Sequence, residues 1–308
     1  MYDVVVVGGG PAGLSAALVF GRQRRSVLVV DAGEPRNAPA AEMHMYLGRD
    51  GGAPAALLAD GRAELAAYPT VEVRRGRAVS ARGESDAFEL GIDDGTTVAT
   101  RRLVLATGQV DEPVDVPGLR ERWGTSVFHC PFCHGYETTG TTLAVVNNGP
   151  FAMLGAYGRD RVSDDVVVCT NGPSTLPAPV AGVMAERGIR VVESPITTVT
   201  GELGALVLTF ADGSTLQREA IYHRAPTRQS SDLAAQLGAE HLDDGCVRVD
   251  EFGATTVAGV SAVGDSARLA ALPDALTLVS AGAADGVRAA VWMDQGLFRA
   301  GLPFTPGG

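Results

Sequence analysis

Two cysteines, Cys130 and Cys133, are separated by two residues and flanked by His129 and His134. This spacing brings the two sulfurs within disulfide range, especially across the first turn of a helix, where a thiol pKa falls from ~8.5 towards ~3.5–7.5. A pair of this kind exchanges electrons with an external thiol or disulfide through a mixed disulfide. The segment therefore predicts a redox-active pair, with His129 and His134 as candidate catalytic neighbours.

A zinc site is the main alternative for these cysteines. Structural zinc usually takes four ligands from two such pairs, and the chain has no second C-x-x-C. The two flanking histidines are too close in sequence to the pair to wrap around one ion, so we expect no metal. An inert buried pair is the other alternative. Cys169 and Cys246 lie in apolar, strand-like surroundings and are expected to be small core residues.

A glycine-rich turn near the N-terminus predicts a dinucleotide site. Gly8, Gly10 and Gly13 follow the apolar run Val4–Val7 in a G-x-G-x-x-G pattern that leads into a helix-like stretch. The three glycines allow a tight turn, close approach of the backbone to a pyrophosphate, and close packing of helix on strand. The start of the helix offers amide donors to phosphates. Asp31 ends the next strand-like run, where it can accept hydrogen bonds from ribose hydroxyls.

A second strand-turn-helix unit echoes the first. Leu143–Val146 is followed by Asn147–Gly149 and then by a helix-like stretch. This order is that of a related nucleotide-binding module with a degenerate turn. Proline and glycine mark two crossings between the modules, near 111–118 and near 223–231. We therefore expect a discontinuous first domain, 1–112 plus 232–308, and a second domain, 113–231, that carries the cysteine pair.

Composition excludes several classes of function. The formal net charge of −11 disfavours nucleic acid as a partner. No run approaches the ~18 apolar residues of a membrane span, and the N-terminus lacks the charged start of a signal peptide. Four cysteines are too few for a disulfide scaffold. We expect a cytoplasmic protein without membrane contact.

Two further segments, Leu103–Gly108 and Ser261–Asp265, are strand-like runs that end in small-residue turns. With the glycine turn, their order resembles the flavoprotein disulfide reductases that have two dinucleotide domains. Nearly the whole chain is similar to the low-molecular-weight thioredoxin reductases. The resemblance implies FAD and an α/β fold with two Rossmann-like dinucleotide-binding domains of the three-layer ββα type, the second inserted into the first.

The resemblance also assigns roles to individual residues. Cys133 would face the flavin, Cys130 would meet the external thiol, and His134 stands where the family has an Asp as proton relay. With an unperturbed pKa of about 6.5, His can accept and return a proton near neutrality; a packing role for His134 is the alternative. Asp265 would bind the ribityl chain of FAD, and Thr107 would close over the cofactor near the linker.

The second nucleotide turn departs from that family. It reads Asn147-Asn148-Gly149-Pro150-Phe151-Ala152 where thioredoxin reductases have G-x-G-x-x-A and bind NADPH. Pro150 removes an N–H where phosphates meet the helix start, and the loop after the following strand has no basic residue. We expect NADPH to bind poorly or not at all; an alternative binding mode, or NADH, remains open.

Without NADPH, the resemblance shifts to the dithiol oxidases that close disulfides in gliotoxin- and holomycin-type natural products. The segment Asp31–Asn37, followed by His44, is more similar to this branch, which places Arg36 and Asn37 near the flavin; a polar loop with an Arg-capped turn is the alternative for these two residues. Val79 is expected to offer backbone to the adenine. The residues predicted to contact the cofactor are Gly8, Gly10, Pro11, Ala12, Gly13, Asp31, Ala32, Arg36, Asn37, His44, Val79, Ala106, Thr107, Gly108, Gly264 and Asp265.

The predicted function is oxidation of a small-molecule dithiol to a disulfide through Cys130 and Cys133. Electrons pass to FAD and then to oxygen, which yields hydrogen peroxide. A reductase of thioredoxin or a related disulfide, driven by NADPH or ferredoxin, is the first alternative. A non-catalytic FAD-binding redox sensor is the second. The family resemblance also implies a homodimer.

Overall fold

The computed structural model describes residues 1–302, which divide into two compact units. Unit 1 comprises residues 1–38, 45–110 and the chain from 228 onwards, and unit 2 comprises residues 39–44 and 111–227. The chain passes between the units through β7 (Gln109–Asp111) and β16 (Thr227–Gln229), which pair as a two-stranded sheet. No local pattern of residues predicts that the short segment 39–44 belongs with unit 2.

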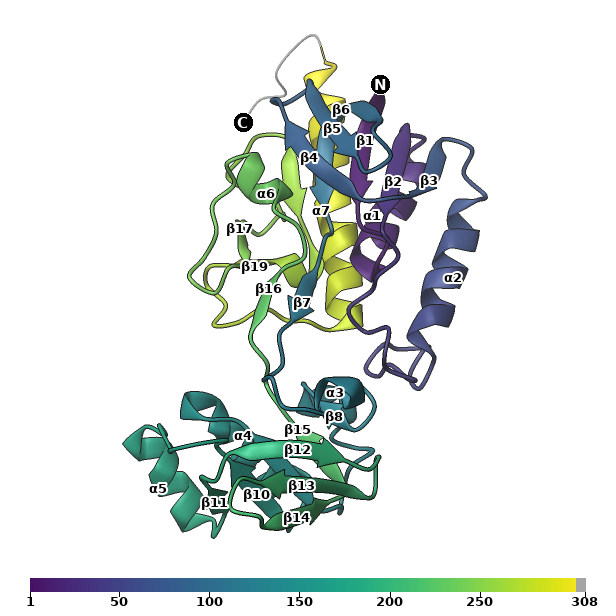
Figure 1. Cartoon of the computed structure of the whole chain (residues 1–308). Helices are drawn as coiled ribbons and strands as arrows, with labels where there is room; N and C mark the ends of the chain where they lie inside the picture. The colour runs from purple at the N-terminus through teal and green to yellow at the C-terminus, as the bar shows by residue number, and fades with distance from the viewer. Residues whose placement is uncertain (303–308) are drawn as a thin grey trace. The chain divides into compact units, whose positions relative to one another are not determined.

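Unit 1 is built on a seven-stranded sheet (Figure 1). Its strands are β1 (Tyr2–Val7), β2 (Val27–Asp31), β3 (Val71–Arg75), β4 (Ala78–Arg82), β5 (Phe88–Ile92), β6 (Thr97–Leu105) and β18 (Val260–Ala262). The first three, β6 and β18 pair in parallel, whereas β4, β5 and β6 pair antiparallel as a meander. The helices are α1 (Pro11–Arg22), α2 (Pro54–Leu65), α6 (Leu233–Gln236) and α7 (Val279–Ala300), and β17 (Val247–Val249) pairs with β19 (Ala267–Leu269).

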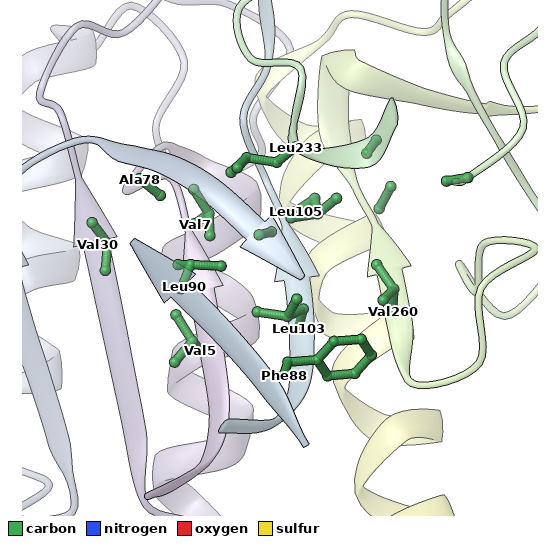
Figure 2. Packing of buried hydrophobic residues seen from close by; sticks show 14 of the residues in the cluster. Val5, Val7, Val30, Ala78, Phe88, Leu90, Leu103, Leu105, Leu233 and Val260 are labelled. Atoms are coloured by element: carbon green, nitrogen blue, oxygen red, sulfur yellow. The ribbon is translucent and has the colours of Figure 1, made fainter. Parts of the chain in front are cut away.

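Two hydrophobic cores place the parallel strands of unit 1 in a middle layer. On one face, Val5 and Val7 of β1 pack with Phe88 and Leu90 of the meander (Figure 2). On the other face, Val4 and its neighbours pack with α1, α2 and α7. Because successive side chains of a strand point to opposite faces, an unbroken valine run suits a strand that is buried on both sides.

Unit 2 repeats this plan. Its parallel sheet has the order β11-β10-β9-β15-β8, and a three-stranded antiparallel sheet has the order β12-β13-β14. The strands are β8 (Val127–Phe128), β9 (Leu143–Val146), β10 (Val166–Cys169), β11 (Arg190–Val192), β12 (Ile196–Thr200), β13 (Leu206–Phe210), β14 (Thr215–Arg218) and β15 (Ala220–Tyr222). The helical segments are η1 (Arg120–Arg122), α3 (Pro131–His134), η2 (Gly149–Ala152), α4 (Met153–Arg161) and α5 (Ala178–Glu186).

The two units share one strand order, as their echoed sequence patterns indicate. β9 lies between β10 and β15 as β1 lies between β2 and β6. The faces of β9 are again divided between two cores, with Val146 facing β12–β14 and Val145 facing α4 and α5. Both units are therefore mixed α/β modules of Rossmann type with parallel sheets.

Some predicted element bounds differ from the observed ones. The strand predicted within Ser261–Asp265 begins one residue earlier, as β18, Val260–Ala262, and the last helix, α7, spans Val279–Ala300. Apolar pattern alone does not mark where backbone hydrogen bonds begin and end. Among the helices of residues 1–302, none is both long enough and apolar enough to cross a membrane.

Candidate functional site: a cofactor cradle and a redox turn

In unit 1 the turn after β1 is shaped by its glycines. Gly8 has φ +110°, and a Cβ there would lie 2.2 Å from the Ala106 carbonyl oxygen. A Cβ on Gly13 would lie 1.9 Å from the Gly8 carbonyl oxygen. These two glycines therefore let β1, the turn and α1 pack against the end of β6. Gly264, after β18, similarly has φ +69° and packs against Ala12.

The same turn leaves an open place for a ligand. A Cβ on Gly10 would meet no atom within 4 Å in the described part of the chain. Helix α1 starts at Pro11, and within residues 1–302 no side chain caps its first turn. Its leading amide groups thus remain available to an anion such as the pyrophosphate of FAD. The residues present fit the predicted cofactor.

Asp31 lies at the carboxyl end of β2, beside this turn. Its Oδ1 accepts hydrogen bonds from the backbone N–H groups of Gly9 at 3.2 Å and of Gly33 at 2.9 Å. Its Oδ2 lies 3.9 Å from an Arg62 nitrogen. The carboxylate is held against the glycine turn, at the sheet edge where open α/β sheets bind ligands.

The other predicted cofactor residues lie around the same edge. Arg36 donates from Nη1 to Oδ2 of Asp265 at 2.9 Å, which joins two residues predicted from distant segments. Ser230 bonds to the carbonyl of Thr107 through its hydroxyl and to that of Gly108 through its N–H. Ala32 and Asn37 are half-buried in the chain that follows β2. The Val79 carbonyl, on β4, accepts a bond from Gln236.

In unit 2 the redox turn follows β8. Cys130 is the N-cap of α3, Pro131 is its first residue, and the Cys133 N–H donates to the Cys130 carbonyl at 3.2 Å. The pair thus spans the first turn of a helix, as its spacing predicts. The turn is anchored by Thr138, whose hydroxyl shares a buried 2.8 Å hydrogen bond with that of Tyr222 on β15. Burial raises the pKa of Tyr222, so its phenol stays neutral.

His134 lies between this turn and the sheet. Its ring stacks on Phe128 of β8, with centroids 4.2 Å apart and an angle of 18° between the planes. Its Nδ1 is buried and has no hydrogen-bond partner among residues 1–302. Burial lowers the pKa of His134; the Glu137 carboxylate raises it and His44 lowers it. A neutral imidazole beside the cysteines is therefore favoured near neutral pH.

His129 lies on the other side of Cys130. Its ring meets Trp123 edge-on at 6.2 Å, and its Nδ1 is 4.0 Å from Oδ1 of Asp111. Trp123 also contacts the ring of His223, which is buried and whose pKa is lowered by that burial. These contacts can hold the His129 ring in place beside the redox turn.

His44, predicted to contact the cofactor, belongs to the segment of unit 2 between 39 and 44. Its Nε2 lies 3.4 Å from Oε1 of Glu137 and 3.7 Å from Oε2 of Glu42. Sequence reasoning assigned no role to Glu137. Its position three residues after His134 was an available signal, because side chains three apart share one side of a helical turn.

In the second nucleotide turn, after β9, two asparagines form hydrogen bonds with other parts of unit 2. Asn147 is buried, donates from Nδ2 to the Arg224 carbonyl at 3.1 Å and accepts from the Arg224 N–H at 2.9 Å. The position of the family's first glycine thus carries a structural side chain. Arg224 also lies over the ring of Phe151, 4.8 Å from its centroid.

Asn148 bridges this turn to the loop after β10. Its Oδ1 accepts from the N–H groups of Gly149 at 2.9 Å and Thr175 at 2.8 Å, and its Nδ2 donates to the Pro173 carbonyl at 2.9 Å. Backbone N–H groups in such a turn are the donors that would bind a phosphate. Here an amide oxygen of the protein itself takes one donor of the turn, from Gly149, and one from the neighbouring loop, from Thr175.

Glu193 adds a negative charge to the same loop, and sequence reasoning missed it. Its Oε2 accepts from the Ser174 N–H at 3.1 Å. The loop after β10 is where the resemblance expects the 2′-phosphate of NADPH. Glu193 lies after β11, 19 residues from Ser174 in sequence, so no local signal in the chain pointed to it.

The remaining cysteines are buried, as expected. Cys169 is part of the core between the two sheets of unit 2, and burial raises its thiol pKa to about 12. Burial raises the pKa of Cys246 to about 11, and its sulfur accepts from Gln109 at 3.3 Å. Within the described residues, no cluster of three or more His, Cys, Asp or Glu side chains is placed to hold a metal ion.

Comparisons with known proteins agree with this arrangement. Residues 2–286 match the model of the pyridine nucleotide-disulphide oxidoreductase family. The chain is 34% identical over 291 residues to thioredoxin reductase tcpT of Claviceps purpurea, covering 90% of both chains. It is 32% identical to thioredoxin reductase sirT of Leptosphaeria maculans, covering 87% of both. The crystal structure of HlmI superposes with a TM-score of 0.87 at 38% identity, covering 96% of this chain and 92% of that one.

Proposed function

Because the chain belongs to the pyridine nucleotide-disulphide oxidoreductase family, we propose that it oxidises a small-molecule dithiol to a disulfide through Cys130 and Cys133. The protein is an FAD-dependent oxidoreductase of thioredoxin reductase-like type. In the proposed reaction the reduced pair Cys130 and Cys133 would give up two electrons, and bound FAD would supply the chemistry that transfers them to oxygen to form hydrogen peroxide. We further propose that unit 1 binds FAD and that unit 2 carries the redox pair on a degenerate nucleotide-binding module.

The proposed direction of electron flow rests on one observation, which is that side chains of the protein itself occupy the nucleotide turn of unit 2. Asn148 binds the Gly149 amide of the turn and bridges the turn to the loop after β10, and Glu193 presents a carboxylate in that loop, where a 2′-phosphate would bind. Charge-assisted phosphate contacts contribute roughly 1.5–3 kcal/mol each, and their loss removes most of the affinity for NADPH. In the proposed reaction, electrons therefore enter from a thiol.

The redox turn supplies the groups that this chemistry needs. The substrate's first thiolate attacks the disulfide at Cys130, forms a mixed disulfide and releases Cys133 as a thiolate. The substrate's second thiolate then attacks the substrate's first sulfur, which is bonded to Cys130 in that mixed disulfide. This step frees Cys130 as a thiolate and releases the product disulfide. His134, kept neutral by burial, accepts the thiol protons.

Anaerobic mixing of the purified yellow protein tests the proposal. Dithiothreitol should bleach the flavin absorbance rapidly, whereas NADPH should leave it unchanged. In air, a dithiol should drive oxygen uptake with one peroxide formed per disulfide. Rapid bleaching by NADPH, together with no oxygen uptake for any dithiol, would exclude a dithiol oxidase.

A reductase remains the second candidate because similar proteins carry the name thioredoxin reductase. In that case electrons leave Cys130 and Cys133 for an external disulfide, and a donor other than NADPH reduces the flavin. Reduced ferredoxin is such a donor. Turnover of a disulfide substrate with ferredoxin, but not with a dithiol and oxygen, would select this candidate.

We also propose a cytoplasmic homodimer. Three apolar side chains of α7 in unit 1 are 38–43% exposed, and Trp292 among them packs edge-on against Phe252, outside that helix, with ring centroids 4.9 Å apart. This group comprises Val287, Val291, Trp292 and Phe252. A second copy would cover such a patch. The small number of cysteines suits a reducing compartment.

A further inference from the structure

A second set of ionisable groups lies beside the redox turn and has no part in the steps described so far. Glu137 follows α3, and His44 reaches it from the segment 39–44 of unit 2. The two side chains are 3.4 Å apart, and Glu42 approaches the same His44 nitrogen at 3.7 Å. The exposed fraction rises from 16% at His44 to 36% at Glu137 and 59% at Glu42.

Oxidation of a dithiol requires a path for protons. The substrate loses two protons and two electrons, and one molecule of oxygen takes up two of each to become hydrogen peroxide. At each attack a substrate thiol transfers its proton to a base, its sulfur forms an S–S bond, and the sulfur displaced from the old S–S bond keeps the electron pair. A buried base that accepts such a proton has to pass it on before the next turnover.

The buried side of the His134 ring offers the proton no route to solvent. One side of its ring is covered by Phe128, and its Nδ1 is buried. In the described part of the chain, the ionisable groups near it include Tyr222, which stays neutral, the two cysteines, and the Glu137–His44 pair. Glu137 lies three residues further on, in the turn after α3 that is closed by a 3.2 Å hydrogen bond from the Thr138 N–H to the His134 carbonyl, and its carboxylate favours the protonated form of His134.

We infer that the Glu137–His44 pair carries protons between His134 and solvent during thiol oxidation at Cys130 and Cys133. Glu137 accepts the proton from the His134 ring, and His44 holds the carboxylate in position and shares the proton through its Nε2. The segment 39–44 thereby contributes a residue to the redox turn of unit 2. The inference rests on the proposed function, because it serves only a reaction in which thiols lose protons at this turn.

The test is the pH dependence of flavin reduction by excess dithiothreitol, followed anaerobically by stopped flow from about pH 6 to about pH 10, which brackets a free thiol pKa of ~8.5. Glu137→Gln should slow reduction on the order of tenfold near neutral pH. The difference should vanish at alkaline pH, where the thiol ionises without a base. Glu137→Asp should recover most of the rate, and His44→Asn should slow it in the same pH-dependent way.

Glu42→Gln is the matched control, since it removes the second carboxylate that approaches the same His44 nitrogen. It should change the rate less than about twofold at any pH, as expected for an exposed ion pair. A Glu137→Gln rate equal to wild type, or lowered by one factor at every pH, would overturn the inference and leave the proposed function standing. A wild-type flavin that no dithiol reduces would overturn both.

Discussion

Cys130 and Cys133 occupy different positions in their helical turn, and we propose a different chemical role for each. Cys130 is the N-cap and Cys133 is the third residue of α3. The proposed steps use Cys130 as the sulfur that meets substrate and release Cys133 as a thiolate. His134 stacks directly behind this turn on Phe128, so a proton acceptor accompanies the pair.

Replacing either cysteine should stop electron transfer without removing the cofactor. Cys133→Ser and Cys130→Ser should each lower flavin reduction by dithiothreitol on the order of a thousandfold or more, because the two sulfurs act as a unit. Both proteins should remain yellow. Cys246→Ser is the control, because it alters a buried thiol in unit 1. Dithiothreitol should reduce the flavin of this variant at the wild-type rate. An active Cys133→Ser protein would contradict the assigned pair.

Acid should destabilise the protein through its buried histidines. Burial lowers the pKa values of His134 and His223 in the folded state, so below about pH 6.5 the unfolded chain binds more protons than the folded one. Their stabilising contribution is complete above that pH and is lost as the pH falls, by about 1.4 kcal/mol for each unit of pKa difference. The free energy of unfolding from urea titrations should therefore be lower at about pH 5.5 than at about pH 7.5.

His134→Gln removes one of the two groups and should make this decrease smaller. An unfolding free energy that is the same at both pH values would show that the two histidines titrate alike in the folded and unfolded states.

At the scale of elements, the turn between β1 and α1 contains two glycines that are needed for different reasons. Gly8 is required by the fold, since it has φ +110° and a Cβ would collide with the Ala106 carbonyl. Gly10 faces open space. The same Cβ therefore disturbs the protein at one position and the cofactor at the other.

Gly8→Ala should lower the free energy of unfolding by at least about 1–2 kcal/mol through backbone strain alone, and FAD should be lost with it. Gly10→Ala should leave the unfolding free energy of the apoprotein unchanged and weaken FAD binding. Urea titration of the apoproteins and fluorescence titration with FAD measure the two effects. Equal FAD affinity for Gly10→Ala and wild type would place the pyrophosphate elsewhere.

At the scale of the whole molecule, the units repeat one topology and differ in what fills their nucleotide turns. In unit 1 the space at Gly10 is open, whereas in unit 2 Asn148 bridges the turn to the neighbouring loop. One unit thus keeps the features that hold a dinucleotide, and the other keeps the scaffold that positions a redox turn.

The proposed homodimer gives a prediction at this scale. Trp292→Glu on α7 places a charge in the exposed apolar patch and should shift the protein from dimer to monomer in sedimentation velocity. Leu203→Glu, at an exposed apolar position of unit 2, is the matched control and should leave the mass unchanged. A Trp292→Glu protein that sediments like wild type would remove α7 from the interface.

The sequence by itself determined the local features: the valine run buried on both faces, the glycine turn that leads into α1, and the C-x-x-C across a helical turn. These depend on residues close together in the chain, where spacing dictates geometry. The tertiary structure alone decided which distant groups meet. Glu193 reached the loop after β10, His44 joined Glu137 from the segment 39–44, and Arg36 paired with Asp265. Such contacts arise from strand order and loop paths, which no local pattern of residue types encodes.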